Sequence, residues 1–225
     1  MDSLMPILAI VPPTAAFLIF SAVLFLKYGK KKDRTTMYFM ISFLLIGAGY
    51  SVWVIRTLFL PRHPDAETVI FWVKVTYLGA SFILFVGLAA LEFIKPETIR
   101  KTRNLLLFAA PMIFMEILIL LSDPPVGIVA GQSDVIWPPV LSSIIFIIAL
   151  FYLLIPNYVF IWFLMKNPEH RLYGKVRLME VGLLIFTFFV LMEGAKIGME
   201  SWGLFIRWFT ALGAFIMLYG YIKHQ

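Results

Sequence analysis

Residues 140–165, VLSSIIFIIALFYLLIPNYVFIWFLM, form a stretch of 26 residues without a single charged side chain. A helix needs roughly 20 mostly apolar residues to cross the ~30 Å hydrocarbon core of a bilayer. Backbone groups in lipid must be hydrogen-bonded within their own segment, so this stretch is predicted to be a helix. It therefore indicates a membrane protein.

Six further stretches of the chain have a similar character, so the sequence predicts seven membrane-spanning helices. The predicted spans are Leu4–Leu26, Thr36–Leu60, Val69–Ile94, Leu105–Ser122, Val140–Met165, Leu178–Glu200 and Gly203–Ile222. The residues between these spans are too few to form a second domain, so residues 1–225 are predicted to form one domain. The expected fold class is all-α: a polytopic membrane protein built as a seven-transmembrane-helix bundle.

The composition agrees with a membrane protein and argues against other classes. Hydrophobic residues make up 61% of the chain and charged residues only 14%, whereas soluble domains carry about 25% charged residues. The apolar runs are continuous and about twice as long as the roughly 10-residue alternating strands of a membrane barrel. A transmembrane β-barrel is therefore excluded.

The positive charges gather after alternate predicted spans. The Lys and Arg residues that follow the first, third, fifth and seventh spans are Lys27, Lys30, Lys31, Lys32, Arg34, Lys95, Arg100, Lys101, Arg103, Lys166, Arg171, Lys175, Arg177 and Lys223. Loops rich in Lys and Arg remain cytoplasmic, so the amino terminus is predicted to lie outside and the carboxyl terminus in the cytoplasm. The net charge of +6 is thus a topology signal. It predicts contact with the lipid bilayer, with anionic headgroups as a secondary partner, and it does not indicate nucleic acid.

Charged side chains within membrane spans are costly and mark candidate functional sites. Here they gather, with the aromatic residues Tyr50, Trp53 and Tyr77, in the predicted outer halves of the helices. Glu193 and Lys196 are three residues apart and Lys196 and Glu200 are four apart, so they are predicted to share one helical face. The residues that we expect to converge on an outward-facing polar cavity are Arg56, Lys74, Tyr77, Glu116, Glu193, Lys196 and Arg207. Their slight cationic excess favours a small anionic or zwitterionic ligand.

A simpler interpretation of the same residues stays open. The long basic side chains near helix ends can reach the outer headgroups; they are Arg56, Lys74 and Arg207. The charged residues of 193–200 would then form a local ion-paired ridge on the sixth span. Under this interpretation no cavity is required.

Other polar and small residues predict packing rather than chemistry. Glu92 and Glu180 lie near helix ends beside many Lys and Arg residues, so ordinary ion pairs are expected there, and Asn157 is expected to bond a neighbouring helix. Gly194 and Gly198 form a small-xxx-small pair that permits close helix packing. The outer loop 123–139, with four prolines, either folds over the mouth of the bundle or is a simple connector.

The sequence offers no sign of catalytic or metal chemistry. It has no cysteine, which excludes disulfides and thiolate metal sites. Its three histidines, His63, His170 and His224, are far apart in loops or the tail, so no paired-histidine metal site is expected. Glycine-rich phosphate loops and nucleophile elbows are missing as well. We therefore expect no cofactor, no metal and no enzymatic activity.

Several motifs resemble a known family. The third span contains Phe71-Trp72-Val73-Lys74-Val75-Thr76-Tyr77-Leu78-Gly79 and ends at Glu92-Phe93. A basic loop, Pro111 in the fourth span and Ser122-Asp123-Pro124 before the long outer loop follow. Together these motifs resemble the amino-terminal seven-helix sensor region of prokaryotic histidine kinases, over nearly the whole chain. The resemblance implies a multi-pass protein of the prokaryotic cytoplasmic membrane that receives an extracellular or membrane signal.

The resemblance does not extend to the kinase. No phosphoacceptor helix and no ATP-binding domain follow Lys223, so kinase activity is not carried over. Either the chain is a stand-alone sensor acting through a partner, or it is a fragment. The expected function is a sensor or receptor-like module that binds a small ligand or lipid from outside and signals through a cytoplasmic or membrane partner. The alternative is a small-solute transporter or a structural subunit of a larger membrane complex.

Overall fold

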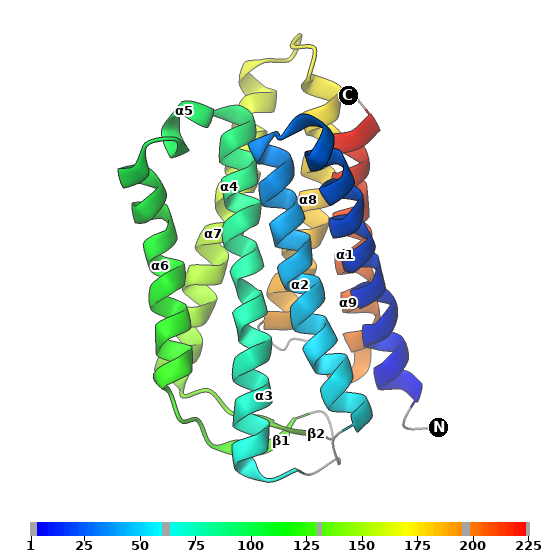
Figure 1. Ribbon diagram of the computed structural model, residues 1–225, viewed down its shortest axis with the longest axis vertical. Coiled ribbons are helices and arrows are strands. Elements are labelled where there is room, and N and C mark those ends of the chain that lie inside the picture. The colour runs from blue at the N-terminus through cyan, green and yellow to red at the C-terminus, as the bar shows by residue number, and fades with distance from the viewer. Residues whose placement is uncertain (1–3, 60–63, 130–131, 195–198, 224–225) are drawn as a thin grey trace.

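The computed structural model describes residues 4–59, 64–129, 132–194 and 199–223. Its long helices run along one axis of the molecule (Figure 1). The elements are, in chain order, α1 (Leu4–Lys31), α2 (Arg34–Phe59), α3 (Ala66–Leu78), the 3-10 turn η1 (Gly79–Ser81), α4 (Phe82–Ile94), α5 (Pro96–Ile99), α6 (Thr102–Leu121), β1 (Val126–Val129), β2 (Gln132–Val135), α7 (Pro139–Lys166), α8 (Tyr173–Gly194) and α9 (Met199–Lys223).

The bundle has two distinct ends. The strands β1 and β2 lie at the same end of the bundle as the start of α1, and we call this the hairpin end (Figure 1). The carboxyl end of α9 lies at the opposite end, together with α5 and the turn from α1 to α2, and we call this the C-terminal end (Figure 1). The chain therefore enters at one end and leaves at the other.

Six of the described helical segments are long and apolar enough to cross a membrane. They are Leu8–Lys31, Arg34–Phe59, Ala66–Ile94, Thr102–Leu121, Pro139–Lys166 and Phe205–Ile222. The third of these joins α3, η1 and α4 into one continuous rod. α8 has 22 residues but carries four charged side chains, Lys175, Arg177, Glu180 and Glu193, which sets it apart from the six. The fold is that of an all-α multi-pass membrane protein with one small hairpin.

The last two helices divide at a different place from the one that the sequence predicts, because Ser201 and Trp202, the predicted break, lie inside α9. α8 stops at Gly194 and α9 begins at Met199, so Glu193 and Glu200 lie on different helices. The predicted single face through residues 193–200 is therefore wrong. Among the described residues, a Cβ on Gly194 would meet nothing within 4 Å. Gly198 lies outside them, so the close packing predicted for this pair stays a prediction.

Close helix packing occurs between α8 and α9 at two other glycines. A Cβ on Gly182 would lie 2.4 Å from the backbone nitrogen of Met217 and 2.6 Å from the carbonyl oxygen of Gly213. A Cβ on Gly213 would lie 2.5 Å from the backbone nitrogen of Phe186. Small residues let membrane helices approach backbone to backbone. The two glycines therefore bring α8 and α9 into direct contact along their middle.

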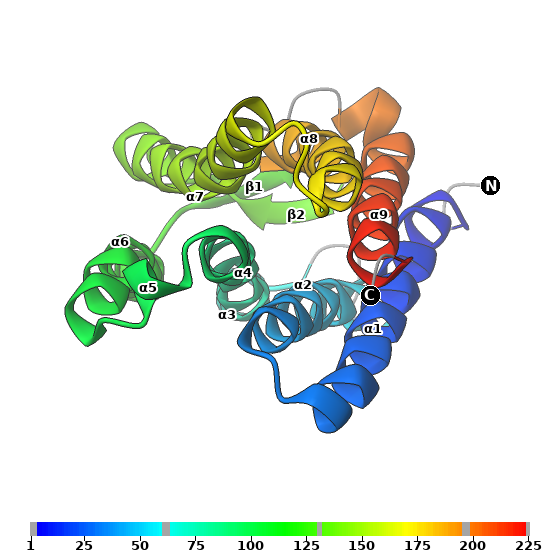
Figure 2. The same cartoon turned by 90° about the horizontal axis from the view of Figure 1, so that it is seen from above.

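The other helices surround this pair unevenly. Figure 2 shows α1 and α2 on one side of α9, with α3 and α4 near the centre. α6 stands at the edge of the molecule, beside α3 and α7 (Figure 2). Many large apolar side chains of α6 are exposed, among them Leu106, Leu107, Ile113, Phe114 and Leu121, as expected for a helix that faces lipid.

Polar residues deeper in the bundle behave differently from one another. Asn157 on α7 donates a hydrogen bond to Thr187 on α8 at 2.9 Å, so its predicted bond to a neighbouring helix is confirmed. Glu92 accepts from Arg100 at 2.8 Å, as expected for an ion pair. Glu180 is buried, and neither carboxylate oxygen has a hydrogen-bond partner among the described residues. The expected ion pair therefore forms at Glu92 but is not seen at Glu180.

Candidate functional site

A partly buried ion pair joins α8 and α9 at the hairpin end. Nε of Arg207 donates a hydrogen bond to Oε1 of Glu193 at 2.8 Å. The two side chains are only 6% and 17% exposed. A charge in such a place is costly unless it is paired and hydrogen-bonded. Each side chain therefore depends on the other for its burial.

α2 contributes a hydroxyl and an aromatic ring to this ion pair. The hydroxyl of Tyr50 donates to the second oxygen of Glu193, Oε2, at 2.5 Å. The indole ring of Trp53, three residues later on the same face of α2, lies 3.8 Å from the guanidinium carbon of Arg207. A guanidinium over an indole ring gains a cation–π interaction. The carboxylate of Glu193 thus links three helices, α2, α8 and α9.

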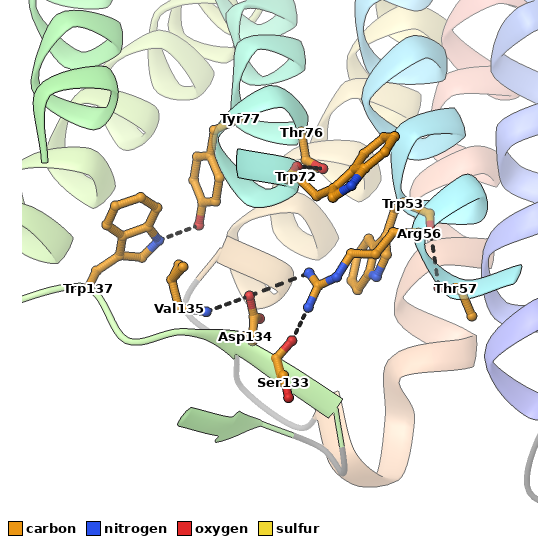
Figure 3. A network of polar contacts seen from close by, with 10 residues as sticks. All are labelled: Trp53, Arg56, Thr57, Trp72, Thr76, Tyr77, Ser133, Asp134, Val135 and Trp137. Atoms are coloured by element: carbon orange, nitrogen blue, oxygen red, sulfur yellow. Dashed lines mark hydrogen bonds and ion pairs between the residues drawn. The ribbon is translucent and has the colours of Figure 1, made fainter. Parts of the chain in front are cut away.

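The next residue on this face of α2 holds the β-hairpin. Nη2 of Arg56 donates to the backbone carbonyl of Ser133, and its Nη1 lies 3.8 Å from Oδ1 of Asp134 (Figure 3). Both partners belong to β2, which pairs with β1 in antiparallel register from Val126↔Val135 to Val129↔Gln132. Tyr50, Trp53 and Arg56 are spaced three residues apart. One stripe of α2 therefore contacts both the ion pair and the hairpin.

The hairpin is also attached to α3. Nε1 of Trp137 donates to the hydroxyl of Tyr77 at 3.1 Å, and the two rings meet edge to face with centroids 5.2 Å apart (Figure 3). Val135 is buried against Val69 and Val73 of α3. Of the two interpretations of loop 123–139, the folded one is therefore correct. The hairpin packs across the ends of α2 and α3, where a simple connector would have no such contacts.

Two of the predicted site residues form contacts between α6 and the α3–η1 rod instead. Nζ of Lys74 donates to the carbonyl of Leu120 at 3.1 Å. Oε1 of Glu116 accepts from the hydroxyl of Ser81 at 2.8 Å, while its buried Oε2 has no partner among the described residues. These contacts fasten α6 to the α3–η1 rod. Lys74 and Glu116 are therefore not part of the Glu193 network.

The structure thus brings together some of the predicted residues and separates others. Arg56, Glu193 and Arg207 gather with Tyr77 around the hairpin end through α2 and β2, and Lys196 lies outside the described residues. That these side chains bind a ligand stays a prediction. Tyr50 and Trp53, which the sequence predicts at the same depth, contribute to this network. The contributing residues that the sequence did not indicate are Ser133, Asp134 and Trp137.

The chemistry of this arrangement is that of binding and orientation. A guanidinium, a carboxylate and indole rings can hold a charged or zwitterionic group by ion pairing and by cation–π contact. Across the described ranges, no three His, Asp or Glu side chains gather in a way that could hold a metal ion.

Comparisons of the chain with protein-family models, with curated proteins and with solved structures found no match.

Proposed function

We propose that this chain is a seven-helix membrane sensor or receptor-like module of the prokaryotic cytoplasmic membrane. The hairpin end faces outward and takes a small anionic or zwitterionic ligand or a lipid. The C-terminal end faces the cytoplasm and signals through a cytoplasmic or membrane partner. Basic residues around the C-terminal end support this orientation, since positively charged loops stay inside. In this proposal α8 also crosses the membrane and brings the number of spans to seven. Its charged residues permit this, because Lys175 and Arg177 lie at its cytoplasmic end and Glu193 is paired.

The observation that carries the proposal is the double use of the Glu193 carboxylate. One oxygen binds Arg207 of α9 and the other binds Tyr50 of α2. A ligand carboxylate or phosphate that competes for Arg207 would change both contacts at once. A ligand shifts a conformational equilibrium only by its difference in affinity between two states. Replacement of Glu193 by a ligand group supplies such a difference at the junction of three helices.

A second link supports transmission to the far end. α2 and α9 meet again at the C-terminal end, where the hydroxyls of Thr36 and Tyr221 lie 2.6 Å apart. The same two helices are therefore joined by polar contacts at both ends of the bundle. A change in their packing at the hairpin end reaches the surface that a cytoplasmic partner would contact.

The test is capture of the partner from native membranes by crosslinking of the tagged full chain, followed by mass spectrometry. We expect a protein with a cytoplasmic signalling domain, whose association or output changes in Glu193→Gln. Glu67→Gln is the matched control, because Glu67 is exposed at the same end and the change of charge is identical. Capture of transport or assembly subunits, with no difference between the variants, would support the transporter or structural-subunit alternative instead.

A further inference from the structure

The C-terminal end contains two lysines packed against one buried tyrosine. Tyr221 of α9 is 2% exposed. Nζ of Lys27, from α1, lies 4.3 Å from the centroid of its ring, and Nζ of Lys175, from α8, lies 4.6 Å from the same centroid. Lys175 is itself only 4% exposed and also lies 5.1 Å from the ring of Phe93 on α4. Three helices of the bundle thus bring two cations to one aromatic ring.

A carboxylate beside this cluster, that of Asp33, already accepts hydrogen bonds from other groups. Oδ2 of Asp33 accepts hydrogen bonds from the hydroxyl of Tyr221 at 2.8 Å, from the hydroxyl of Thr36 at 2.9 Å and from the backbone nitrogen of Thr36 at 3.0 Å. Burial alone would raise the pKa of Asp33, but the hydrogen bonds from Tyr221 and Thr36 outweigh it and hold the pKa below its usual value. Asp33 therefore stays ionised as the cap of α2.

Among the described residues, neither ammonium group has an anionic partner within ion-pair distance. Within the described parts of the chain, no carboxylate oxygen comes within 4.0 Å of Nζ of Lys27 or Lys175. Nζ of Lys27 is buried and makes no hydrogen bond there. An ammonium group has three donors, and burial without acceptors is costly. Contact with the ring of Tyr221 recovers only part of that cost.

A phosphate group would satisfy what this cluster lacks. Its oxygens accept charge-assisted hydrogen bonds from several ammonium groups at once. It would also relieve the repulsion between two like charges gathered at one ring. Basic pockets between membrane helices near the cytoplasmic surface bind anionic headgroups, and the exposed Lys30, Lys31 and Lys32 continue the positive charge just beyond Lys27.

We propose that Lys27 and Lys175, over the ring of Tyr221, form a binding site for a phosphate group, carried by an anionic lipid headgroup or by a soluble phosphate ester. The site lies between α1, α8 and α9 at the C-terminal end. It uses none of the residues of the hairpin end, so it stands whether or not the hairpin end binds a ligand.

The test is native mass spectrometry of the purified full chain in mild detergent, titrated with phosphatidylglycerol and, separately, with phosphatidylcholine. Glycerol 3-phosphate and inorganic phosphate are then added as soluble competitors. The variants are Lys27→Gln/Lys175→Gln and, as a charge-matched control, Lys101→Gln/Lys166→Gln, which removes two exposed lysines. Circular dichroism and size-exclusion chromatography check that each variant is folded.

We expect the wild type to retain phosphatidylglycerol in preference to phosphatidylcholine, or to bind the soluble phosphates. Binding should weaken by roughly tenfold or more in Lys27→Gln/Lys175→Gln, because each lysine supplies a charge-assisted contact, and it should be unchanged in the control. Displacement by glycerol 3-phosphate identifies a soluble ester as the ligand, and its failure to compete identifies the lipid.

The proposal is overturned if the wild type binds none of these probes, or if the control loses as much affinity as the test variant. Equal binding by Lys27→Gln/Lys175→Gln and the wild type also overturns it. Should the double variant fail to fold, Lys27→Arg and Lys27→Gln decide, because Lys27 is only partly buried. Retained binding in the arginine variant and loss in the glutamine variant support the site, and equal binding in both refutes it.

Discussion

The two ends of the bundle use similar groups in opposite ways. At the hairpin end, Arg207 lies over Trp53 and its charge is paired with Glu193. At the C-terminal end, Lys27 and Lys175 lie over Tyr221, but the nearby Asp33 is taken by hydroxyl and amide donors. The first acid neutralises a cation, whereas the second caps a helix. Proximity of acid, base and ring therefore does not by itself settle which charges are satisfied.

The largest expected effect concerns which end faces the cytoplasm. A reporter that is active only in the cytoplasm should give full signal when fused after Gln225, because the basic loops flank the C-terminal end. A fusion that ends the chain within residues 123–139 should give none. Activity measured for both fusions in the same host checks this. The opposite pattern would reverse the assignment of the two ends and remove the basis for an outward-facing ligand site.

Loss of one partner of the hairpin-end ion pair should destabilise the bundle strongly. Arg207→Met leaves the Glu193 carboxylate buried without its cation, and such a change costs about 3 kcal/mol or more of the free energy of unfolding. Unfolding by sodium dodecyl sulfate in mixed micelles measures the change.

The double variant Glu193→Met/Arg207→Met is the control for this prediction, because removal of both charges leaves neither uncompensated. It should recover most of the lost stability. If Arg207→Met is no less stable than the wild type, the ion pair contributes nothing to holding α8 and α9 together.

A smaller loss is expected at the acid of the C-terminal end. Asp33→Ala removes the cap of α2 and the acceptor for Tyr221, so the unfolding free energy should fall by about 1–2 kcal/mol. The folded pKa of Asp33 is lowered, so its contribution is full above its unfolded pKa of about 3.9 and is lost as the pH falls below that value. Unfolding of the wild type and of Asp33→Ala between pH 7 and acid pH should therefore converge. A difference that is independent of pH would contradict this account.

The smallest effect on stability is expected at Lys175, and its replacement should stabilise the protein slightly or leave it unchanged. Lys175→Met places an apolar side chain of similar length between Tyr221 and Phe93, so stability without added lipid should stay the same or rise by about 1 kcal/mol. Thermal unfolding of delipidated protein measures it. A loss as large as that of Arg207→Met would show that Lys175 has a structural partner equivalent to Glu193, and the contrast between the two ends would disappear.

The helices could be predicted because the thickness of a bilayer sets the length of an apolar span. Stretches such as 140–165 are long enough for hydropathy alone to identify them. The hairpin could not be predicted in this way, because strands of four residues are too short to show an alternating pattern. The break between the last two helices was misplaced, because Ser201 and Trp202 were interpreted as a turn and they lie inside α9.

The candidate site was predictable only in part, because depth in the membrane does not specify a partner. Glu193 and Arg207 could be identified because charges within spans are rare. Glu116 shares their half of the bundle, yet its partner is Ser81 of η1 and not a member of the Glu193 network. Tyr50 and Trp53 could be placed at the same depth, but the sequence does not show that the hydroxyl of Tyr50 donates to Glu193. Three-residue spacing of polar and aromatic residues from Tyr50 to Arg56 is the pattern that would have indicated this face of α2.

The contact of Gly182 with Gly213 has a mechanical consequence. Where two backbones touch, there are no side chains to yield, so sliding of α8 along α9 would push each backbone into the other. A rocking motion about that point is the movement that such a contact leaves open. The pair then resembles a lever whose pivot is the two glycines, with Glu193 on one arm and Lys175 on the other. A small separation of α8 and α9 near Glu193 would then be accompanied by a closer approach of the two helices near Lys175.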